Sequence, residues 1–263
     1  MVTRQAPAQE WSPEFLQAYW RLEEDWWWFT GRRHLVAAVC GKSQGVGGRV
    51  LELGCGSGIN AGIFCNGTKY VGVDVSLPSL RHGAAQNSRR LCVATLGNLP
   101  FASSSFDRVL LLDVLEHLDD EGSALDETYR VLREGGEVLV ISPAHMCLWG
   151  AHDVANGHKR RYSATQLRRL LSSHGLEVEK LDYWNCLGFP ALALVRWRDR
   201  MRGLVNKPRG DFREVPRWLN RLLHRLLQME GSLVCQGYRL PMGTSLLAVA
   251  RKGEQHPSGN GRS

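Results

Sequence analysis

The chain has 263 residues, of which 43% are hydrophobic, and it carries a formal net charge of +7. This composition supports a sizeable core, and no stretch reaches the roughly 18–20 apolar residues of a membrane span. Seven cysteines without a Cys-x-x-Cys pair argue against a disulfide framework or a zinc site. The first ten residues are polar and hold no signal-peptide core, so we expect a cytoplasmic protein.

Aromatic residues at helical spacing mark the start of the chain. Trp11, Phe15 and Tyr19 lead into the run 26–29, Trp-Trp-Trp-Phe. This pattern predicts a helical, aromatic extension over residues 1–45.

From residue 49 the chain alternates short apolar runs with helical stretches, which indicates a parallel sheet with crossover helices. The runs are typical of strands that are buried on both faces. The predicted strands are 50–53, 70–74, 91–95, 106–113, 137–142, 176–183 and 244–250. The predicted helices are 59–65, 77–87, 120–132 and 163–173, the last opening with a capping box between Ser163 and Gln166.

The positive charge belongs to one segment. Residues 185–240 contain eleven Lys and Arg but four Asp and Glu. We expect residues 46–184 and 241–253 to form the core, 185–240 to be a helical insertion, and 254–263 to be a disordered tail. In the insertion, Arg217, Arg221 and Arg225 follow one helical face, whereas Trp218 and several leucines follow another. The insertion is therefore a packing helix with a solvated basic face, or a lid or membrane-surface element.

The stretch 50–60 reads as a buried strand, a turn with glycines at 54, 56 and 58, and the start of a helix. Glycines allow a sharp turn and a close approach of a ligand to the backbone, and a helix N-terminus favours polar groups. Asp74 ends the next predicted strand, where a carboxylate can accept hydrogen bonds from both hydroxyls of a ribose. The same side chain could instead cap the following helix.

Two details separate this turn from a dinucleotide-binding loop. The third glycine comes one residue early, and Ile59 stands where the Gly-x-Gly-x-x-Gly fingerprint requires glycine. Glu52 precedes the turn, where a carboxylate suits an ammonium or sulfonium group better than a pyrophosphate. An NAD-dependent dehydrogenase is therefore the weaker alternative.

Six motifs in order carry a resemblance to a known family. They are Val-Leu-Glu-Leu-Gly-Cys-Gly-Ser-Gly (50–58), Gly-Val-Asp-Val-Ser (72–76), Leu-Pro-Phe (99–101), Ser-Phe-Asp-Arg-Val (105–109), Asp-Val-Leu-Glu-His-Leu (113–118) and Arg-Val-Leu-Arg-Glu-Gly-Gly-Glu-Val-Leu-Val (130–140). Together they resemble the class I S-adenosylmethionine-dependent methyltransferases, near the small-molecule group that includes ubiquinone-type methyltransferases. The resemblance covers about residues 49–180 and the last strand.

This resemblance implies an α/β fold, a Rossmann-like doubly wound sheet with six parallel strands and an antiparallel seventh. S-adenosyl-L-methionine would be the cofactor, bound at the carboxyl ends of the strands. Its methionine part would contact Glu52 and the glycine turn, and its ribose would contact Asp74. The implied cofactor residues are Glu52, Gly54, Gly56, Gly58, Asp74, Thr95, Leu96, Asp113 and His117.

Two of these implications have qualifications. Thr95 and Leu96 would lie along the adenine, although related sequences often carry an acidic residue near this point. The stretch 26–33 resembles an N-terminal element of some bacterial relatives, which would be a lid over the cofactor or a cover for a sheet edge.

The stretch 142–162 follows the fifth predicted strand and leaves the edge of the sheet where the cofactor is expected. A general base assists methyl transfer to oxygen or nitrogen, and histidine has a suitable pKa. His152, with Asp153 beside it, and His158 are the base candidates, and Tyr162 is a candidate for orienting the acceptor. Alternatively, residues 158–162 only pin the loop to the sheet. The histidines lack the tight spacing of known metal sites, so we expect no metal.

The predicted function is methyl transfer from S-adenosylmethionine to a small-molecule, lipid-linked or glycan acceptor, with the methylated atom left open. A cofactor-binding regulatory or interaction protein without catalysis is the alternative. Nucleic acid is disfavoured as acceptor, because the strand before Asp113 is not followed by an Asn/Asp-Pro-Pro-Tyr motif. The basic segment 185–240 predicts peripheral association with an anionic membrane.

Overall fold

The computed structural model describes residues 12–42, 48–64, 67–86, 90–205 and 215–253. The predicted tail at 254–263, the first part of the N-terminal extension and residues 206–214 of the insertion lie outside the described residues.

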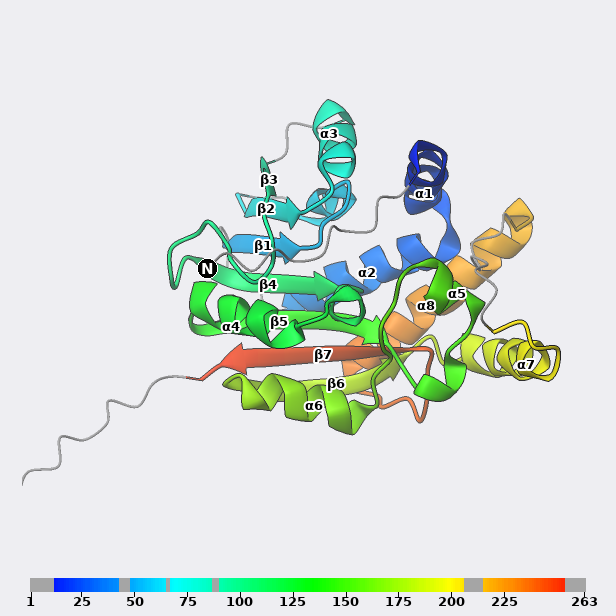
Figure 1. Ribbon diagram of the computed structural model, residues 1–263. Helices are drawn as coiled ribbons and strands as arrows, with labels where there is room; N and C mark the ends of the chain where they lie inside the picture. The colour runs from blue at the N-terminus through cyan, green and yellow to red at the C-terminus, as the bar shows by residue number, and fades with distance from the viewer. Residues whose placement is uncertain (1–11, 43–47, 65–66, 87–89, 206–214, 254–263) are drawn as a thin grey trace, which may run out of the picture.

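Seven strands form one sheet, in the order β3-β2-β1-β4-β5-β7-β6 (Figure 1). Neighbouring strands from β3 to β5 are parallel, whereas β7 runs antiparallel to both β5 and β6. This confirms the predicted fold of six parallel strands and an antiparallel last strand. The strands are β1 (Arg49–Leu53), β2 (Lys69–Asp74), β3 (Arg90–Val93), β4 (Phe106–Leu112), β5 (Leu132–Pro143), β6 (Leu176–Trp184) and β7 (Ser245–Lys252).

Several predicted boundaries are wrong. The segment after the glycine turn is a short 3-10 helix, η1 (Ile59–Ile63), and β3 ends two residues before its predicted end. Helix α4 (Glu121–Val131) stops before Leu132, because this leucine is fully buried and pairs with Phe106 of β4. Strand β5 therefore begins at Leu132, five residues before its predicted start at residue 137.

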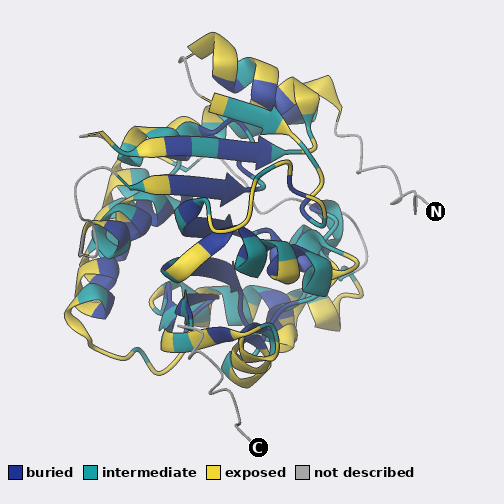
Figure 2. Cartoon of the chain, turned by 90° about the vertical axis from the view of Figure 1, so that its left-hand side faces the viewer, coloured by how far each residue is buried: buried dark blue, intermediate teal, exposed yellow. Residues whose placement is uncertain are grey.

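Helices cover both faces of the sheet, and alternate side chains of each strand face opposite layers. Val109 and Leu111 of β4 pack in the cluster with α4 and α6 (Ala164–Ser173), and α6 opens with the predicted capping box. Leu110 and Leu112 face α2 (Trp27–Lys42) and α8 (Arg217–Gln236). The strands are mostly buried between these layers, and the outer sides of the helices are exposed (Figure 2).

Helices α2 and α8 pack directly on each other, although one belongs to the N-terminal extension and the other to the insertion. A Cβ placed on Gly31 of α2 would lie 2.6 Å from Leu227 of α8, and one placed on Gly231 of α8 would lie 3.4 Å from Leu35 of α2. The missing side chains let the two helix backbones approach closely. The extension and the insertion thus build one helical layer of the core together.

The predicted apolar face of α8 is only partly correct. Trp218 and Leu222 are exposed and lie beside Arg221 and Arg225, which are exposed too. The buried side is centred on Leu227 instead, because the contact with α2 sets which face points inward. In the described part of the chain, no helix is both long and apolar enough to cross a membrane.

The parallel strands β1, β2, β4 and β5 point toward one end of the molecule. Helices α1 (Pro13–Asp25), α5 (Ala151–Ala155) and α7 (Gly188–Met201) lie at that end (Figure 1). Helix α3 (Leu77–Gln86) and the short 3-10 helices η2 (Leu115–His117) and η3 (Met146–Leu148) follow the strands β2, β4 and β5 directly. Ligands of open α/β sheets bind at the carboxyl ends of the strands, so this end carries the candidate site.

Candidate functional site

The glycine turn after β1 needs glycine at all three positions. Gly54, Gly56 and Gly58 have φ values of +69°, +55° and +68°, a region that side chains rarely adopt. A Cβ on Gly54 would also lie 2.5 Å from Val114, whereas one on Gly56 would meet only an oxygen of Glu23 at 3.6 Å. The middle of the turn therefore presents bare backbone at the carboxyl end of β1.

Glu52 is buried in β1, just before the turn. Its carboxyl group accepts hydrogen bonds from the Asn60 side-chain amide at 2.6 Å and from the Tyr70 hydroxyl. Burial raises the pKa of Glu52 to about 7, although these two hydrogen bonds favour the ionised form. Glu52 is therefore poised to gain charge when a cation comes near.

Asp74 joins the turn to the end of β2. One carboxylate oxygen accepts from the backbone N–H of Gly56 at 2.8 Å, and the other accepts from the N–H of Ser76 at 2.8 Å. Burial raises the pKa of Asp74, and the backbone hydrogen bonds oppose this shift. Ser76, rather than Asp74, accepts the hydrogen bond from Ser79 in the first turn of α3. The helix-capping interpretation of Asp74 is therefore wrong.

Thr95 and Leu96 lie in the loop that follows β3, next to the end of β2. Thr95 is exposed, and its carbonyl accepts from the N–H of Asn98 at 3.2 Å. The Leu96 side chain packs in the core cluster with α4 and α6. Only the backbone of residue 96 can therefore face a ligand at this edge.

Helix α1 covers the glycine turn, a contact that the sequence did not predict. The carboxylate of Glu23 is buried and accepts from the Ser57 hydroxyl at 2.8 Å. Burial raises the pKa of Tyr19, and the charges of Glu23, Arg32, Asp113 and Asp74 all act on this hydroxyl. The regular aromatic spacing indicated the helix, but no local pattern indicated that its acidic residue reaches a turn 34 positions away.

Asp113 follows β4 with a φ of +56°, an unusual conformation for a side chain of this kind. Its carboxylate forms a 2.6 Å ion pair with Arg32 of α2, whose guanidinium lies over the rings of Trp28 and Phe29. Burial raises the pKa of Asp113, and Arg32 opposes this shift. The N-terminal extension thus supplies the counter-charge for this site residue.

Histidines from two loops meet beside Asp113. The rings of His117 and His158 lie edge to face with centroids 4.6 Å apart, and the ring of His152 lies 5.9 Å from that of His158. The sequence placed Asp153 beside His152, but Asp153 bonds to Nδ1 of His158 at 2.9 Å. Burial and the neighbouring positive groups lower the pKa of His117 to about 3, so this ring is neutral at physiological pH.

Asp153 is the buried centre of the loop. It accepts from Nε of Arg161 at 2.8 Å and from the N–H of Gly150 at 2.8 Å, in addition to His158. Burial opposes ionisation of Asp153, but the hydrogen bonds from His158 and Arg161 lower its pKa far below the usual range. The carboxylate stays charged and fixes the orientation of the His158 ring.

The end of this loop is tied to the sheet by its backbone. The N–H of Tyr162 donates to Pro143, and the carbonyl of Tyr162 accepts from His145. Arg161 donates to the carbonyl of Ala144. Within the stretch 158–162 that was interpreted as pinning the loop, Arg161 and Tyr162 make these contacts to the end of β5, whereas His158 bonds to Asp153. The Tyr162 hydroxyl is buried and has no hydrogen-bond partner among the described residues.

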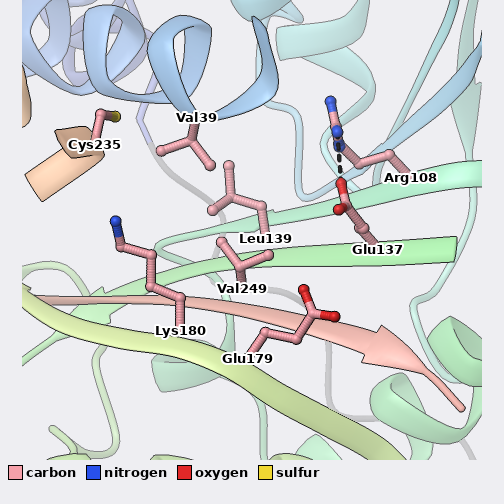
Figure 3. Close-up of a pocket in the computed structure, with 8 residues that line it drawn as sticks. All are labelled: Val39, Arg108, Glu137, Leu139, Glu179, Lys180, Cys235 and Val249. Carbon is pink, nitrogen blue, oxygen red and sulfur yellow. Dashed lines mark hydrogen bonds and ion pairs between the residues drawn. The ribbon is translucent and has the colours of Figure 1, made fainter. Parts of the chain in front are cut away.

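A cavity lined by Arg108, Glu137 and Lys180 lies elsewhere in the molecule (Figure 3). Arg108 of β4 and Glu137 of β5 form a 2.6 Å ion pair, and Val39 and Cys235 come from α2 and α8. This cavity is separate from the candidate site, because the latter gathers at the carboxyl ends of the strands.

Comparisons with known proteins agree with this geometry. Residues 51–140 match a family model described as a methyltransferase domain. A probable S-adenosylmethionine-dependent methyltransferase of Mycolicibacterium smegmatis is 33% identical over 162 residues, which are 60% of this chain and 62% of that protein. One from Mycobacterium tuberculosis is 30% identical over 59% of this chain and 57% of its own length. The matched region thus spans about three fifths of these relatives.

Solved structures show the same fold at low sequence identity. A chain from the complex between the Haloferax volcanii Trm112 methyltransferase activator and a putative methyltransferase has a TM-score of 0.61 and 17% identity, over 90% of this chain and 94% of its own. A Haemonchus contortus phosphoethanolamine N-methyltransferase 2 in complex with S-adenosyl-L-methionine has a TM-score of 0.60 and 17% identity, over 94% of this chain and 58% of its own.

Proposed function

Because the chain carries a methyltransferase domain of the class I, S-adenosylmethionine-dependent family, we propose that the protein transfers a methyl group to a small-molecule, lipid-linked or glycan acceptor. One observation carries this proposal: the glycine turn, Asp74, Asp113 and the histidines all gather at the carboxyl ends of the strands. The charges of Asp74 and Asp113 both act on the Tyr19 hydroxyl, and that of His158 acts on Asp113. These groups therefore lie close enough to serve one ligand.

The residues at this edge fit the cofactor of the family. The open side of Gly56 gives the backbone contact that a flexible methionine tail needs, and Glu52 can pair with its ammonium group. Asp74 already accepts two N–H donors and offers the remaining lone pairs of its carboxylate to ribose hydroxyls. The loop at Thr95 and Leu96 would lie along the adenine. S-adenosylmethionine would supply a methyl group bound to a sulfonium sulfur, which keeps the bonding electron pair and departs as a neutral thioether.

The histidines beside Asp113 are the proposed acid–base groups. His158 is oriented by Asp153, and His152 lies next to it, so either ring can accept a proton from an acceptor oxygen or nitrogen. His117 would border the methyl-donor pocket, and the buried Tyr162 hydroxyl would orient the acceptor after a small rearrangement of the loop. Most of the rate enhancement would come from holding two reactants in line and excluding water.

A peripheral contact with an anionic membrane is a second proposal for the same chain. Trp197 of α7 and Trp218 of α8 are about 60% and 66% exposed, and exposed arginines accompany them on both helices. Aromatic and basic side chains on one surface suit the interface of an anionic bilayer. Such a contact would bring a lipid-linked acceptor to α7, which packs on the loop at 146–150.

Cofactor binding to the Asp74→Ala variant tests the site. We expect S-adenosylmethionine to bind at least about tenfold more weakly by calorimetry, because a charged hydrogen-bond acceptor is lost. Asp126→Ala is the matched control, since Asp126 is exposed and pairs with His174, which follows the end of α6. Unchanged affinity of a folded Asp74→Ala protein would show that the cofactor does not bind here.

Labelled methyl donor with fractionated lipid, glycan and metabolite extracts tests the catalytic step. Transfer of label to one fraction identifies the acceptor class. Tight binding of the cofactor without transfer to any fraction would favour the alternative, a cofactor-binding regulatory or interaction protein.

A further inference from the structure

Glu116 stands out because its buried carboxyl group is unsatisfied. It lies in η2, directly after Asp113 and its turn, and the residue is 0% exposed. Among the described residues, neither of its carboxyl oxygens has a hydrogen-bond partner. A buried carboxyl without a partner costs several kcal/mol, so native proteins normally supply a donor or a cation.

Two imidazoles lie beside this carboxyl group. One ligand atom each from Glu116, His117 and His158 lies within 4.8 Å of the others. The ligands of a tetrahedral zinc ion are about 3.4 Å apart, so a shift of about 1 Å would close the group around an ion. Two imidazoles and one carboxylate are a common donor set for divalent transition metals.

The surroundings orient these donors as a metal site requires. Asp153 bonds to Nδ1 of His158, which leaves Nε2 with its lone pair directed away from the carboxylate. Arg161 in turn fixes Asp153. The N–H of Lys159 donates to the carbonyl of Glu116 at 2.7 Å, so the backbone holds the two ligand-bearing segments together.

From this arrangement we propose that Glu116, His117 and His158 bind one divalent transition-metal ion, such as Zn²⁺, Mn²⁺ or Co²⁺. The ion would sit beside Asp113, at the acceptor side of the cofactor site, with a position left for an acceptor oxygen or nitrogen. It would polarise that atom as a Lewis acid, and His152 would remain as the histidine that takes the proton. Metal binding by these residues is measurable without methyl transfer, so it stands or falls independently of the proposed function.

Metal binding by the full chain tests this proposal. The chelator-treated protein is titrated with Zn²⁺, Mn²⁺, Co²⁺ or Mg²⁺ in calorimetry, and bound metal is counted after dialysis. We expect one transition-metal ion per chain, a rise in melting temperature, and weaker binding of Mg²⁺, which prefers oxygen ligands. With Co²⁺, a visible absorption band would report nitrogen ligation.

Three variants locate the ion. Glu116→Gln and His158→Ala should each lower the affinity at least tenfold and abolish the rise in melting temperature. Asp153→Asn should lower the affinity by about tenfold through the orientation of His158. His174→Ala is the control, because this histidine follows the end of α6 and pairs with Asp126.

The proposal is wrong if the wild type binds no ion. It is also wrong if a folded Glu116→Gln protein binds the ion as tightly as the wild type does. Glu116→Gln keeps the size of the side chain, so its melting temperature without metal shows whether the fold is intact.

Discussion

At the scale of single residues, charged side chains from distant positions share one buried end of the sheet. Glu23, Glu52, Asp74, Asp113 and Glu116 are acidic, and burial raises the pKa of each of them. Burial thus disfavours their charged forms, and among them Asp113 has the ion pair with Arg32. A cation that enters this end would favour the ionised carboxylates, so the field here strengthens as a cation approaches.

The raised pKa of Glu52 makes the stability of the protein depend on pH. The folded pKa of about 7 lies above the ordinary value of 4.5, so the folded state holds a proton that the unfolded state loses between these values. Stability should therefore fall as pH rises from about 4.5 to 7. Glu52→Gln removes this loss. On going from pH 4.5 to pH 8, the free energy of unfolding of the variant should therefore rise by about 1–3 kcal/mol relative to that of the wild type. Urea unfolding at both pH values measures the difference.

Glu127→Gln is the control with the opposite sign. Hydrogen bonding with Arg130 lowers the pKa of Glu127 from 4.5, so the wild type loses this contribution as pH falls below 4.5, and a third measurement below that pH reports it. A pH dependence of Glu52→Gln that equals that of the wild type would show that Glu52 is ionised in the folded protein.

At the scale of elements, the contact between α2 and α8 is the least local feature of the fold. Gly31 is the point of closest approach, since a Cβ there would overlap both Cδ1 and Cβ of Leu227. The Cβ of Leu227 cannot move without its backbone. The contact between the two helices thus requires glycine at position 31 of α2 but not at position 41.

Two Gly→Ala substitutions in α2 test this contact. Gly31→Ala should destabilise the protein by about 1–3 kcal/mol, because the added methyl group overpacks the interface. Gly41→Ala should be neutral or stabilise by up to about 1 kcal/mol, because nothing lies within 4 Å of that position and alanine favours the helix. The free energy of unfolding in urea measures both. Equal effects of the two changes would mean that the helices do not pack as described.

At the scale of the whole molecule, the charge is distributed unevenly. The core is nearly neutral, whereas residues 185–240 carry the excess of Lys and Arg. Exposed arginines on α7 and α8 carry part of this charge, and exposed aromatic and aliphatic side chains accompany them. The surface they form is therefore the part of the molecule that would meet an anionic partner.

Co-sedimentation with vesicles tests the proposed membrane contact. We expect the protein to sediment with vesicles that contain phosphatidylserine, to stay in solution with phosphatidylcholine alone, and to be released by salt. The triple change of Arg217, Arg221 and Arg225 to Gln should weaken binding roughly 10- to 100-fold, at about 1 kcal/mol for each charge. The same change at Arg81, Arg168 and Arg169 removes equal charge elsewhere and is the control. A wild-type protein that stays in solution with phosphatidylserine vesicles would refute the membrane contact.

The sequence by itself determined the succession of strands and helices along the chain, the glycine turn after the first strand and the position of Asp74 at the end of the second. These features show locally in the sequence: short apolar runs bounded by turn residues, a turn that only glycine can make, and a capping box between residues three positions apart. Boundaries failed where a distant strand decided them, as at Leu132, which joins β5 because Phe106 pairs with it.

Only the tertiary structure decided which distant groups meet. It paired Asp153 with His158 instead of His152, brought Glu23 to Ser57 and Arg32 to Asp113, and turned Trp218 outward. It also placed Glu116, His117 and His158 together although 41 residues separate the two histidines. Such contacts depend on how loops leave a common sheet edge and on helix packing, and neither leaves a periodic pattern in the sequence.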